Sequence, residues 1–215
     1  MIELTVGMAV AMLVIGGAVA IYSNTAKSQR DALNLARLAQ NTRAAMQVMT
    51  LELARSGFVG DSTDSFPLSN PFFSTTSGSS TDLAVYNGGS CIVFAYNRDN
   101  DSPPVVDSNE RLGFRLSSNT LQTRTGGAVH NDDCGSGSWE SLLAPDIEVT
   151  ALNFVVTSNS VDASTGATTC SSGNRCMALR EVSISLTARL SSDTSVQQSL
   201  LGRARLRNLK VTVQP

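Results

Sequence analysis

The sequence predicts an α+β fold, in which one long N-terminal helix packs on an antiparallel β-sheet with disulfide-stapled loops. Three observations predict it. Residues 4–22 carry no charge, and a helical pattern continues from them to about residue 56. Beyond residue 57 the apolar period changes from 3.6 to 2, which is typical of strands. Four cysteines occur, all in this second part. A length of 215 residues suits one domain with an appended helix, or two small domains.

The apolar stretch from Leu4 to Tyr22 contains 19 residues, and no charge follows it before Lys27. At about 1.5 Å per residue it spans roughly 28 Å, close to the thickness of a bilayer core. No A-x-A-like cleavage site clearly ends it and the helical pattern continues, so a cleaved signal peptide is disfavoured. We expect residues 1–23 to form the transmembrane or filament-core half of the helix. A plain membrane anchor explains the length but leaves Glu3 unexplained.

Residues 24–57 are predicted to form the amphipathic half of the same helix, which would be roughly 85 Å long in all. No proline or glycine occurs between Ser23 and Ser56, and Gly57 then offers a left-handed C-cap. Apolar or small residues recur at spacings of three and four, so this half needs only one partner surface. They are Leu35, Leu38, Thr42, Ala45, Met46, Met49 and Leu53.

Gly16 and Gly17 interrupt the apolar half of the helix. Each costs roughly 1 kcal/mol relative to alanine in a helix interior. Small residues also permit close contact between helices in lipid. We therefore interpret the pair as a point of helix flexibility, where the helix could loosen when its neighbours change.

Residues 58–215 are predicted to form a globular, β-rich head that begins with a long loop over residues 58–82. The clearest strand is Glu181–Leu190, where apolar and polar residues alternate as in a sheet with one buried face. A second polar loop is expected over residues 157–178. The other predicted strands are Ala84–Tyr86, Cys91–Tyr96, Leu112–Leu116, Thr120–Arg124, Ile147–Val156 (with Val149 and Phe154 inward) and Leu206–Val213.

An even number of cysteines behind an apolar helix indicates export and disulfides. Cys170 and Cys176 enclose the turn-rich segment SSGNR, which predicts a local disulfide between them. Cys91 and Cys134 then pair by elimination. The alternatives are buried free thiols or a metal site. Because CxxC spacing is absent and His130 is the only histidine, zinc is disfavoured.

An acidic segment contains candidate ligands for calcium. Asn97, Asp99 and Asp101 place oxygen-bearing side chains at alternating positions, and Asp107 and Glu110 follow. An EF-hand loop uses oxygen ligands at positions 1, 3 and 5 with a glutamate at 12, whereas Glu110 stands at position 14 here. The alternative is a solvated acidic turn without a metal. No other cofactor is expected.

Other chemistry has weaker support. The net charge is −2 and no basic patch has interleaved aromatic residues, so nucleic acid is not an expected partner. His130 has no GxSxG motif to accompany it, which argues against a hydrolase. Trp139 is expected to pack in the core or at its rim. A cluster of basic residues near the end of the chain is interpreted as a solvated face or subunit contact: Arg203, Arg205, Arg207 and Lys210.

The segment Ile2-Glu3-Leu4 at the head of a leaderless apolar helix resembles the start of type IV pilins and pseudopilins. In that superfamily the glutamate lies four residues after a methylated first residue, which follows a cleaved basic leader. Here Glu3 lies two residues after Met1, so we expect the sequence to begin two residues after the family's processed start. The resemblance implies that Ile2, Glu3 and Leu4 serve filament assembly. The glutamate would pair with the terminal amine of a neighbouring subunit.

The later sequence resembles PilW-type minor pilins. The resemblance rests on the runs SCIVFAYNRDNDSPPVVDSNERLGFRL and CGSGSWESLLAPDIEVTALNF. It implies a non-enzymatic subunit that helps to initiate or cap a type IV pilus. The implied partners are other pilin subunits, the inner-membrane assembly machinery and, before assembly, the membrane. The implied location is the bacterial inner membrane and then the cell-surface pilus. The alternatives are a J-type pseudopilin of type II secretion, a major pilin, or a membrane-anchored extracytoplasmic binding domain.

Overall fold

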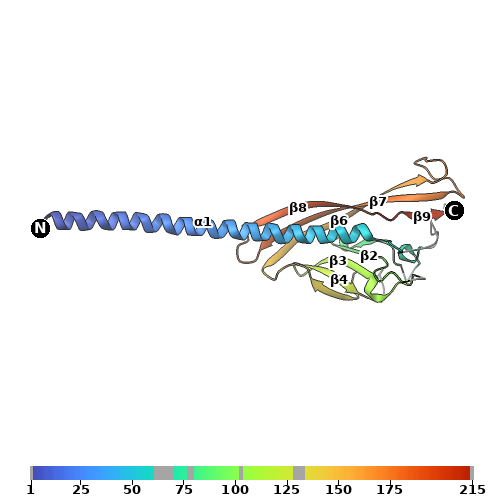
Figure 1. Cartoon of the computed structure of the whole chain (residues 1–215), viewed down its shortest axis with the longest axis horizontal. Helices are drawn as coiled ribbons and strands as arrows, with labels where there is room; N and C mark the ends of the chain where they lie inside the picture. Colours follow the sequence, from blue (N-terminus) through green and yellow to red (C-terminus); the bar gives the residue numbers. More distant parts are fainter. Residues whose placement is uncertain (1, 61–69, 77–79, 102–103, 128–133, 214–215) are drawn as a thin grey trace.

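The structure, a computed structural model, describes residues 2–60, 70–76, 80–101, 104–127 and 134–213. It has the predicted α+β architecture, with one long helix and antiparallel strands. The helix extends far beyond the head at its N-terminal end (Figure 1). The C-terminal strand lies at the opposite end of the molecule, beside the tip of a long hairpin (Figure 1).

The helix α1 covers Ile2–Arg55, in agreement with the predicted range. Its first buried residue is Leu38, so the residues before it extend away from the head. Gly57 follows with φ of +75°, the left-handed conformation expected of a residue just beyond a helix end. Leu35 was expected in the buried stripe, but it lies short of the head and is 49% exposed. The rest of the stripe is buried, as predicted.

The strands form two antiparallel sheets where the sequence predicted one. The first sheet has five strands in sequential order: β1 (Ala84–Tyr86), β2 (Cys91–Ala95), β3 (Arg111–Ser117), β4 (Thr120–Gly126) and β5 (Ser138–Ser141). Ser118 and Asn119 join β3 to β4 with φ of 48° and 59°, as a tight two-residue hairpin requires. Short 3₁₀ turns cover Pro71–Phe73, Asn87–Gly89 and Ser108–Glu110.

The second sheet is built on a long hairpin. Its strands are β6 (Ile147–Asp162), β7 (Arg175–Leu190), β8 (Gln197–Arg205) and β9 (Lys210–Val213). β6 and β8 flank β7, and β9 pairs with the part of β7 that β8 leaves free. The alternation predicted for Glu181–Leu190 is present, with the apolar residues buried and the polar residues facing outward.

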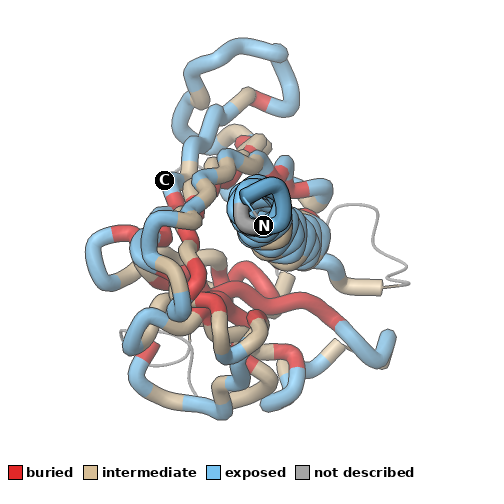
Figure 2. The backbone as a smooth tube through the Cα atoms, turned by 90° about the vertical axis from the view of Figure 1, so that its left-hand side faces the viewer, coloured by how far each residue is buried: buried red, intermediate tan, exposed pale blue. Residues whose placement is uncertain are grey.

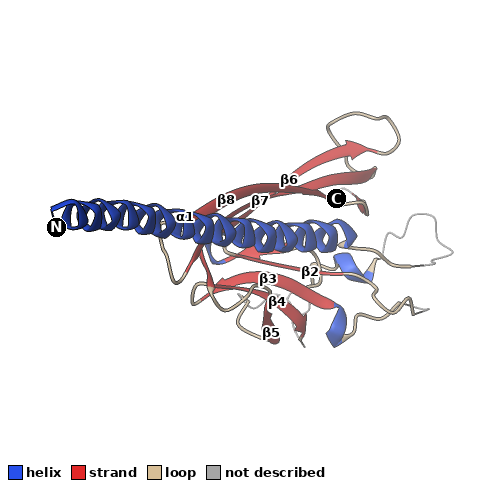
Figure 3. Cartoon of the chain, turned by 60° about the vertical axis from the view of Figure 1, so that its left-hand side comes forward, coloured by secondary structure: helices blue, strands red, loops and turns tan. Residues whose placement is uncertain are grey.

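The helix lies in the angle between the two sheets, and the three layers share one core. In Figures 1 and 3, β7 and β8 lie on one side of α1 and β2–β4 on the other. The view along the helix shows buried strands beside the packed half and an exposed N-terminal half (Figure 2). The core joins Leu38, Met49 and Leu53 of the helix with apolar residues of both sheets.

Several strand boundaries differ from the predicted ones. The polar loop expected over residues 157–178 is shorter, because β6 continues to Asp162 and β7 begins at Arg175. The last strand is only Lys210–Val213, and the preceding residues 206–209 form an irregular crossing over the end of α1. β5 and β8 were not predicted. On β8 the inward positions include Gln198 and Gly202, so polar and small residues mask the alternation.

Candidate assembly site

The first half of α1 is an apolar surface without a partner in the described chain. Its most apolar stretch has no buried residue, and the helix is long and apolar enough to cross a membrane. Apolar side chains in water are unfavourable in proportion to their area, so this half requires lipid or other helices. The large ones are 54–80% exposed: Ile2, Leu4, Val6, Met8, Val10, Met12, Leu13, Val14, Ile15, Val19, Ile21 and Tyr22.

Glu3 lies in the first turn of α1 and is exposed. Ile2 and Leu4 beside it are 80% and 71% exposed. A carboxylate in the first turn interacts favourably with the N-terminal end of the helix dipole. Lys27, the next charged residue, is about 36 Å farther along the helix at 1.5 Å per residue. Glu3 is therefore the only charged side chain of the apolar half.

Gly16 and Gly17 lie within continuous α-helix. A Cβ atom added at either position would meet no atom within 4 Å, apart from the helix's own backbone. Neither glycine is therefore required by a contact within the described chain. Their role in flexibility stays a prediction.

The second half of α1 is held tightly by the head. Gly202 on β8 faces Met46, and the side chain of Met46 occupies the space that a Cβ at Gly202 would need. The Thr42 hydroxyl donates to the carbonyl of Leu38 at 2.8 Å, which satisfies a polar group in a buried position. Arg37 forms an ion pair of 3.1 Å with Asp146 near the start of the packed region. Packing and polar contacts together fix the direction in which the apolar half projects.

The C-terminal end of α1 is capped by distant parts of the chain. The backbone N–H of Arg207 donates to the carbonyl of Ala54 at 3.1 Å. The side-chain amide of Asn208 donates to the carbonyls of Arg55 and Ser56, both at 3.1 Å. The last carbonyls of a helix lack hydrogen-bond donors within the helix. Here residues 207–208 supply those donors. The irregular crossing before β9 thus has a structural role.

Tyr96 links the helix to the first sheet. Its hydroxyl donates to Oε2 of Glu52 at 2.7 Å, and Arg55 pairs with Oε1 of the same carboxylate at 3.2 Å. Burial raises the pKa of Tyr96, and the hydrogen bond to Glu52 raises it further. The phenol therefore stays protonated and can keep donating this hydrogen bond.

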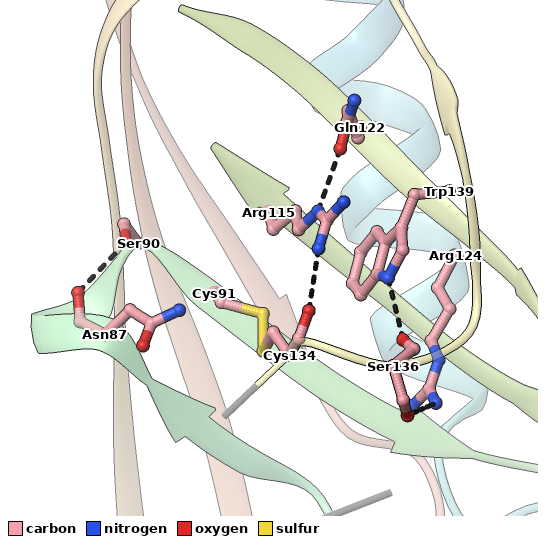
Figure 4. The surroundings of a disulfide bond; sticks show 9 residues. All are labelled: Asn87, Ser90, Cys91, Arg115, Gln122, Arg124, Cys134, Ser136 and Trp139. Carbon is pink, nitrogen blue, oxygen red and sulfur yellow. Dashed lines mark hydrogen bonds between the residues drawn. A yellow bond between two sulfur atoms is a disulfide. The ribbon is translucent and has the colours of Figure 1, made fainter. Parts of the chain in front are cut away.

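The first disulfide joins Cys91 on β2 to Cys134, as predicted. Figure 4 shows the neighbouring side chains. The guanidinium of Arg115 donates to the carbonyl of Cys134 at 2.7 Å and lies 4.2 Å from the centre of the Trp139 ring. The indole N–H of Trp139 donates to the carbonyl of Ser136 at 2.9 Å. Trp139 is half-buried and packs against this disulfide cluster, which agrees with the predicted rim position.

The second disulfide joins Cys170 to Cys176 in the β6–β7 connection, also as predicted. Asp162 organises the same connection. One carboxylate oxygen accepts from the backbone N–H groups of Ser164 and Thr165, and the other accepts from the side-chain amide of Asn174 at 2.7 Å. These hydrogen bonds, that of Asn174 foremost, lower the pKa of Asp162. The tip of the long hairpin is therefore fixed by both covalent and polar contacts.

The acidic segment brings together three of the five residues predicted to bind calcium. Oxygen atoms of Asp99, Asp101 and Glu110 lie within 4.8 Å of one another. Oδ1 of Asp101 is shielded from solvent and has no hydrogen-bond partner among the described residues. Asn97 instead accepts from the backbone N–H of Asn100 at 2.6 Å, and Asp107 caps the 3₁₀ turn. Calcium binding stays a prediction.

Glu110 is the buried member of this trio. Its carboxylate accepts from the backbone N–H groups of Arg98 at 2.7 Å and Asp107 at 2.9 Å. Burial raises its pKa, the two backbone hydrogen bonds oppose this, and the charges of Asp99 and Asp101 raise the pKa further. A cation among these oxygens would favour the ionised form, because opposite charge lowers the pKa of a carboxyl group.

The basic cluster is split between elements. Arg203 and Arg205 lie on β8, Arg207 lies in the crossing, and all three are exposed. Lys210 on β9 is not part of this exposed group. Its amine lies 2.6 Å from Asp82, and only 20% of its side chain is exposed. The prediction of a solvated face or subunit contact is therefore wrong for Lys210. His130 lies outside the described residues.

A buried ion-pair network was not predicted. Asp82 accepts from Arg180 at 2.6 Å through one oxygen and from Lys210 at 2.6 Å through the other. The guanidinium of Arg180 also lies 4.7 Å from the centre of the Phe73 ring. This network ties the segment before β1 to β7 and β9. Asp82, Arg180 and Lys210 are far apart in the sequence, and no local pattern predicts that they form ion pairs.

The sequence matches the model of one known protein family. The model of the family "Prepilin peptidase-dependent protein B" matches residues 31–206, which include the packed part of α1 and the head as far as the end of β8. No curated protein and no solved structure matches the chain. Because the family match spans well over half of the sequence, the chain belongs to the prepilin peptidase-dependent protein B family and is a pilin-like protein.

Proposed function

We propose that this protein is a PilW-type minor pilin, which enters a type IV pilus through α1 and helps to initiate or cap the filament. One observation carries the proposal. The helix is locked into the head from Leu38 onward, while its apolar first half is exposed and carries a single charge at Glu3. An exposed apolar helix of this kind is suited to two successive environments, first the inner membrane and then a bundle of similar helices.

Glu3 supplies specificity to this assembly. An unpaired carboxylate in an apolar bundle is strongly unfavourable, and a nearby cation offsets most of that cost. A terminal amine of a neighbouring subunit would provide the cation in one axial register only. The carboxylate would therefore favour correct insertion and penalise wrong registers. Ile2 and Leu4 would pack around the pair and exclude water. No catalytic step is required of the chain.

The test is substitution of Glu3 by alanine and by glutamine in cells that assemble filaments. Sheared surface filaments and membranes are then assayed for this chain. Both variants should remain in the membrane and be depleted from filaments by tenfold or more, since 1.4 kcal/mol already corresponds to tenfold. Asp31→Ala is the matched control, because Asp31 is the next acidic residue of α1 and is exposed. Wild-type incorporation of both Glu3 variants would overturn the proposal.

Two measurements separate the rival roles. Deletion of the chain should reduce surface pili, whereas loss of protein secretion with intact pili would identify a type II secretion pseudopilin. The stoichiometry of the chain in purified filaments should be low, because a dominant subunit would be a major pilin. An anchored binding domain would keep its location and activity after Glu3→Ala.

A further inference from the structure

A groove runs between the last turns of α1 and the chain that leaves β8. Its volume is about 640 Å³. The floor is apolar, with Leu51 of the helix 50% exposed and Leu209 of the crossing 38% exposed. Thr50, Ala54, Leu179 and Leu206 complete that floor. Leucines exposed in this way at the bottom of a groove are suited to burial by a partner.

Three arginines border this groove, two on the face of β8 that is turned away from the core and one in the crossing. They are Arg203, Arg205 and Arg207, and all are exposed. Arg203 approaches Glu181 at 3.9 Å with 79% of its side chain exposed, which is a weak contact. Arg205 and Arg207 have no ion pair among the described residues. The groove therefore combines an apolar floor with three arginines, of which only Arg203 has an ion pair among the described residues.

The spacing of the arginines on β8 selects an extended ligand. Residues two apart on a strand, such as Arg203 and Arg205, are about 6.6–6.8 Å apart, so carboxylates at alternate positions of another extended chain have matching spacing for these two. β8 pairs with β7 on one edge, and no described strand pairs with its other edge. An open edge is a template for strand addition, and arginines along it disfavour segments without complementary charge.

We propose that this groove binds an extended acidic segment of a neighbouring pilin-type subunit other than a second copy of this chain. The segment would carry carboxylates at alternate positions facing Arg203 and Arg205, and one apolar side chain on the floor formed by Leu51 and Leu209. The proposal rests on the proposed function, because it takes the neighbour from the same filament. It adds a contact between heads to the contact between helices, and it explains how a subunit could choose a particular neighbour.

Photo-crosslinking in filament-forming cells tests the groove. A photoreactive amino acid replaces Leu209 in the full-length chain, and the captured peptide is identified by mass spectrometry. A second reporter at Val14 in the exposed half of α1 monitors assembly through the helix. Leu209 should capture a different pilin-type subunit, at a segment with Asp or Glu at alternate positions. Capture of a second copy of this chain, of nucleic acid, of lipid, or of a segment without acidic residues overturns the proposal.

Charge variants make the test specific. Arg205→Glu should lower capture at Leu209 by roughly tenfold or more, because like charges across an interface repel strongly. Arg205→Lys should retain capture. Arg175→Glu is the matched control, since it makes the same charge change at an exposed arginine of the same sheet. Replacing an acidic residue of the captured segment by arginine should restore capture by the Arg205→Glu chain. A misfolded head could not be rescued in this way. Unchanged capture by Arg205→Glu overturns the proposal.

The Val14 reporter separates the two proposals. If Val14 captures a neighbour and Leu209 captures none, the groove proposal fails and the pilin role stands. If neither position captures a neighbour and Glu3→Ala has no effect on filaments, the pilin role fails and the groove proposal fails with it.

Discussion

The hydroxyl of Tyr96 lies 2.7 Å from Oε2 of Glu52, so the residue that follows β2 is hydrogen-bonded directly to α1. Tyr96 is 5% exposed and its ring packs near Phe94. Glu52 is also held by Arg55. This contact couples the stability of the head to the direction of α1, because Glu52 lies in the last turn of the helix's packed half.

Tyr96→Phe should lower the free energy of unfolding by about 1–2 kcal/mol. It removes one hydrogen bond to a charged acceptor, which contributes about 1.5–3 kcal/mol, but Glu52 keeps Arg55 and part of its solvation. Urea unfolding of the full chain in detergent, followed by the fluorescence of Trp139, measures this. Tyr22→Phe is the control, because Tyr22 is 76% exposed. Equal stability of both variants would show that the bond contributes nothing.

Gly57→Ala should destabilise the head by about 2–4 kcal/mol. A left-handed conformation costs a non-glycine residue about 1–2 kcal/mol, and the new Cβ would collide with the ring of Phe73. Gly88→Ala isolates the first effect, since Gly88 has φ of +63° but open space around it. It should lose only about 1–2 kcal/mol. The same urea assay distinguishes them, and equal losses would exclude a contribution from the collision.

The sequence predicted the helix and most strands because their patterns are local. The period of 3.6 needs only neighbouring turns, and alternation such as that of Val182 and Ile184 needs only one strand. The sequence did not predict where one sheet ends and another begins. On β6 a register shift between Val149 and Ala151 moves the inward positions by one residue, so that Leu152 faces the core. Such irregularities depend on the partner strand.

The site was predictable to the extent that its residues are close in sequence. The turn-rich segment between Cys170 and Cys176 identified that disulfide, and three acidic residues of the predicted calcium set do meet. The contacts that cap α1 come from residues 207–208, about 150 residues away from the helix end. Their backbone and amide groups have no sequence signature, because any residue can donate a backbone N–H. These capping contacts between distant parts of the chain could therefore be identified only from the structure.

The two disulfides should differ in their effect on stability. Cys91 and Cys134 are 43 residues apart, whereas Cys170 and Cys176 are 6 apart. In the chain-entropy description, closing the longer loop contributes about 4 kcal/mol and closing the shorter one about 2 kcal/mol. Paired alanine variants of each disulfide, compared by urea unfolding of the full chain, should show the larger loss for Cys91 and Cys134. The reverse order would show that native-state contacts dominate.

The acidic trio predicts a decrease of stability with rising pH. Burial raises the pKa of Glu110 above its ordinary value of 4.5, so the folded chain holds this proton more tightly than the unfolded chain. The stabilising contribution is complete below pH 4.5 and is lost as the pH rises through the folded-state pKa. Asp99→Asn removes a charge that raises the pKa of Glu110, so this variant should lose less stability as the pH rises. Unfolding free energies at successive pH values measure it, with Asp31→Asn as control.

Calcium should reverse this loss if the trio binds it. The ion requires ionised carboxylates, so it must displace the Glu110 proton and bind better at pH 7 than at pH 4.5. Millimolar calcium should therefore raise the melting temperature of the full chain at pH 7 relative to chelator, and do so less at pH 4.5. Asp99→Asn should diminish the rise and Asp31→Asn should retain it. An unchanged melting temperature at pH 7 would identify the segment as an acidic turn that binds no calcium.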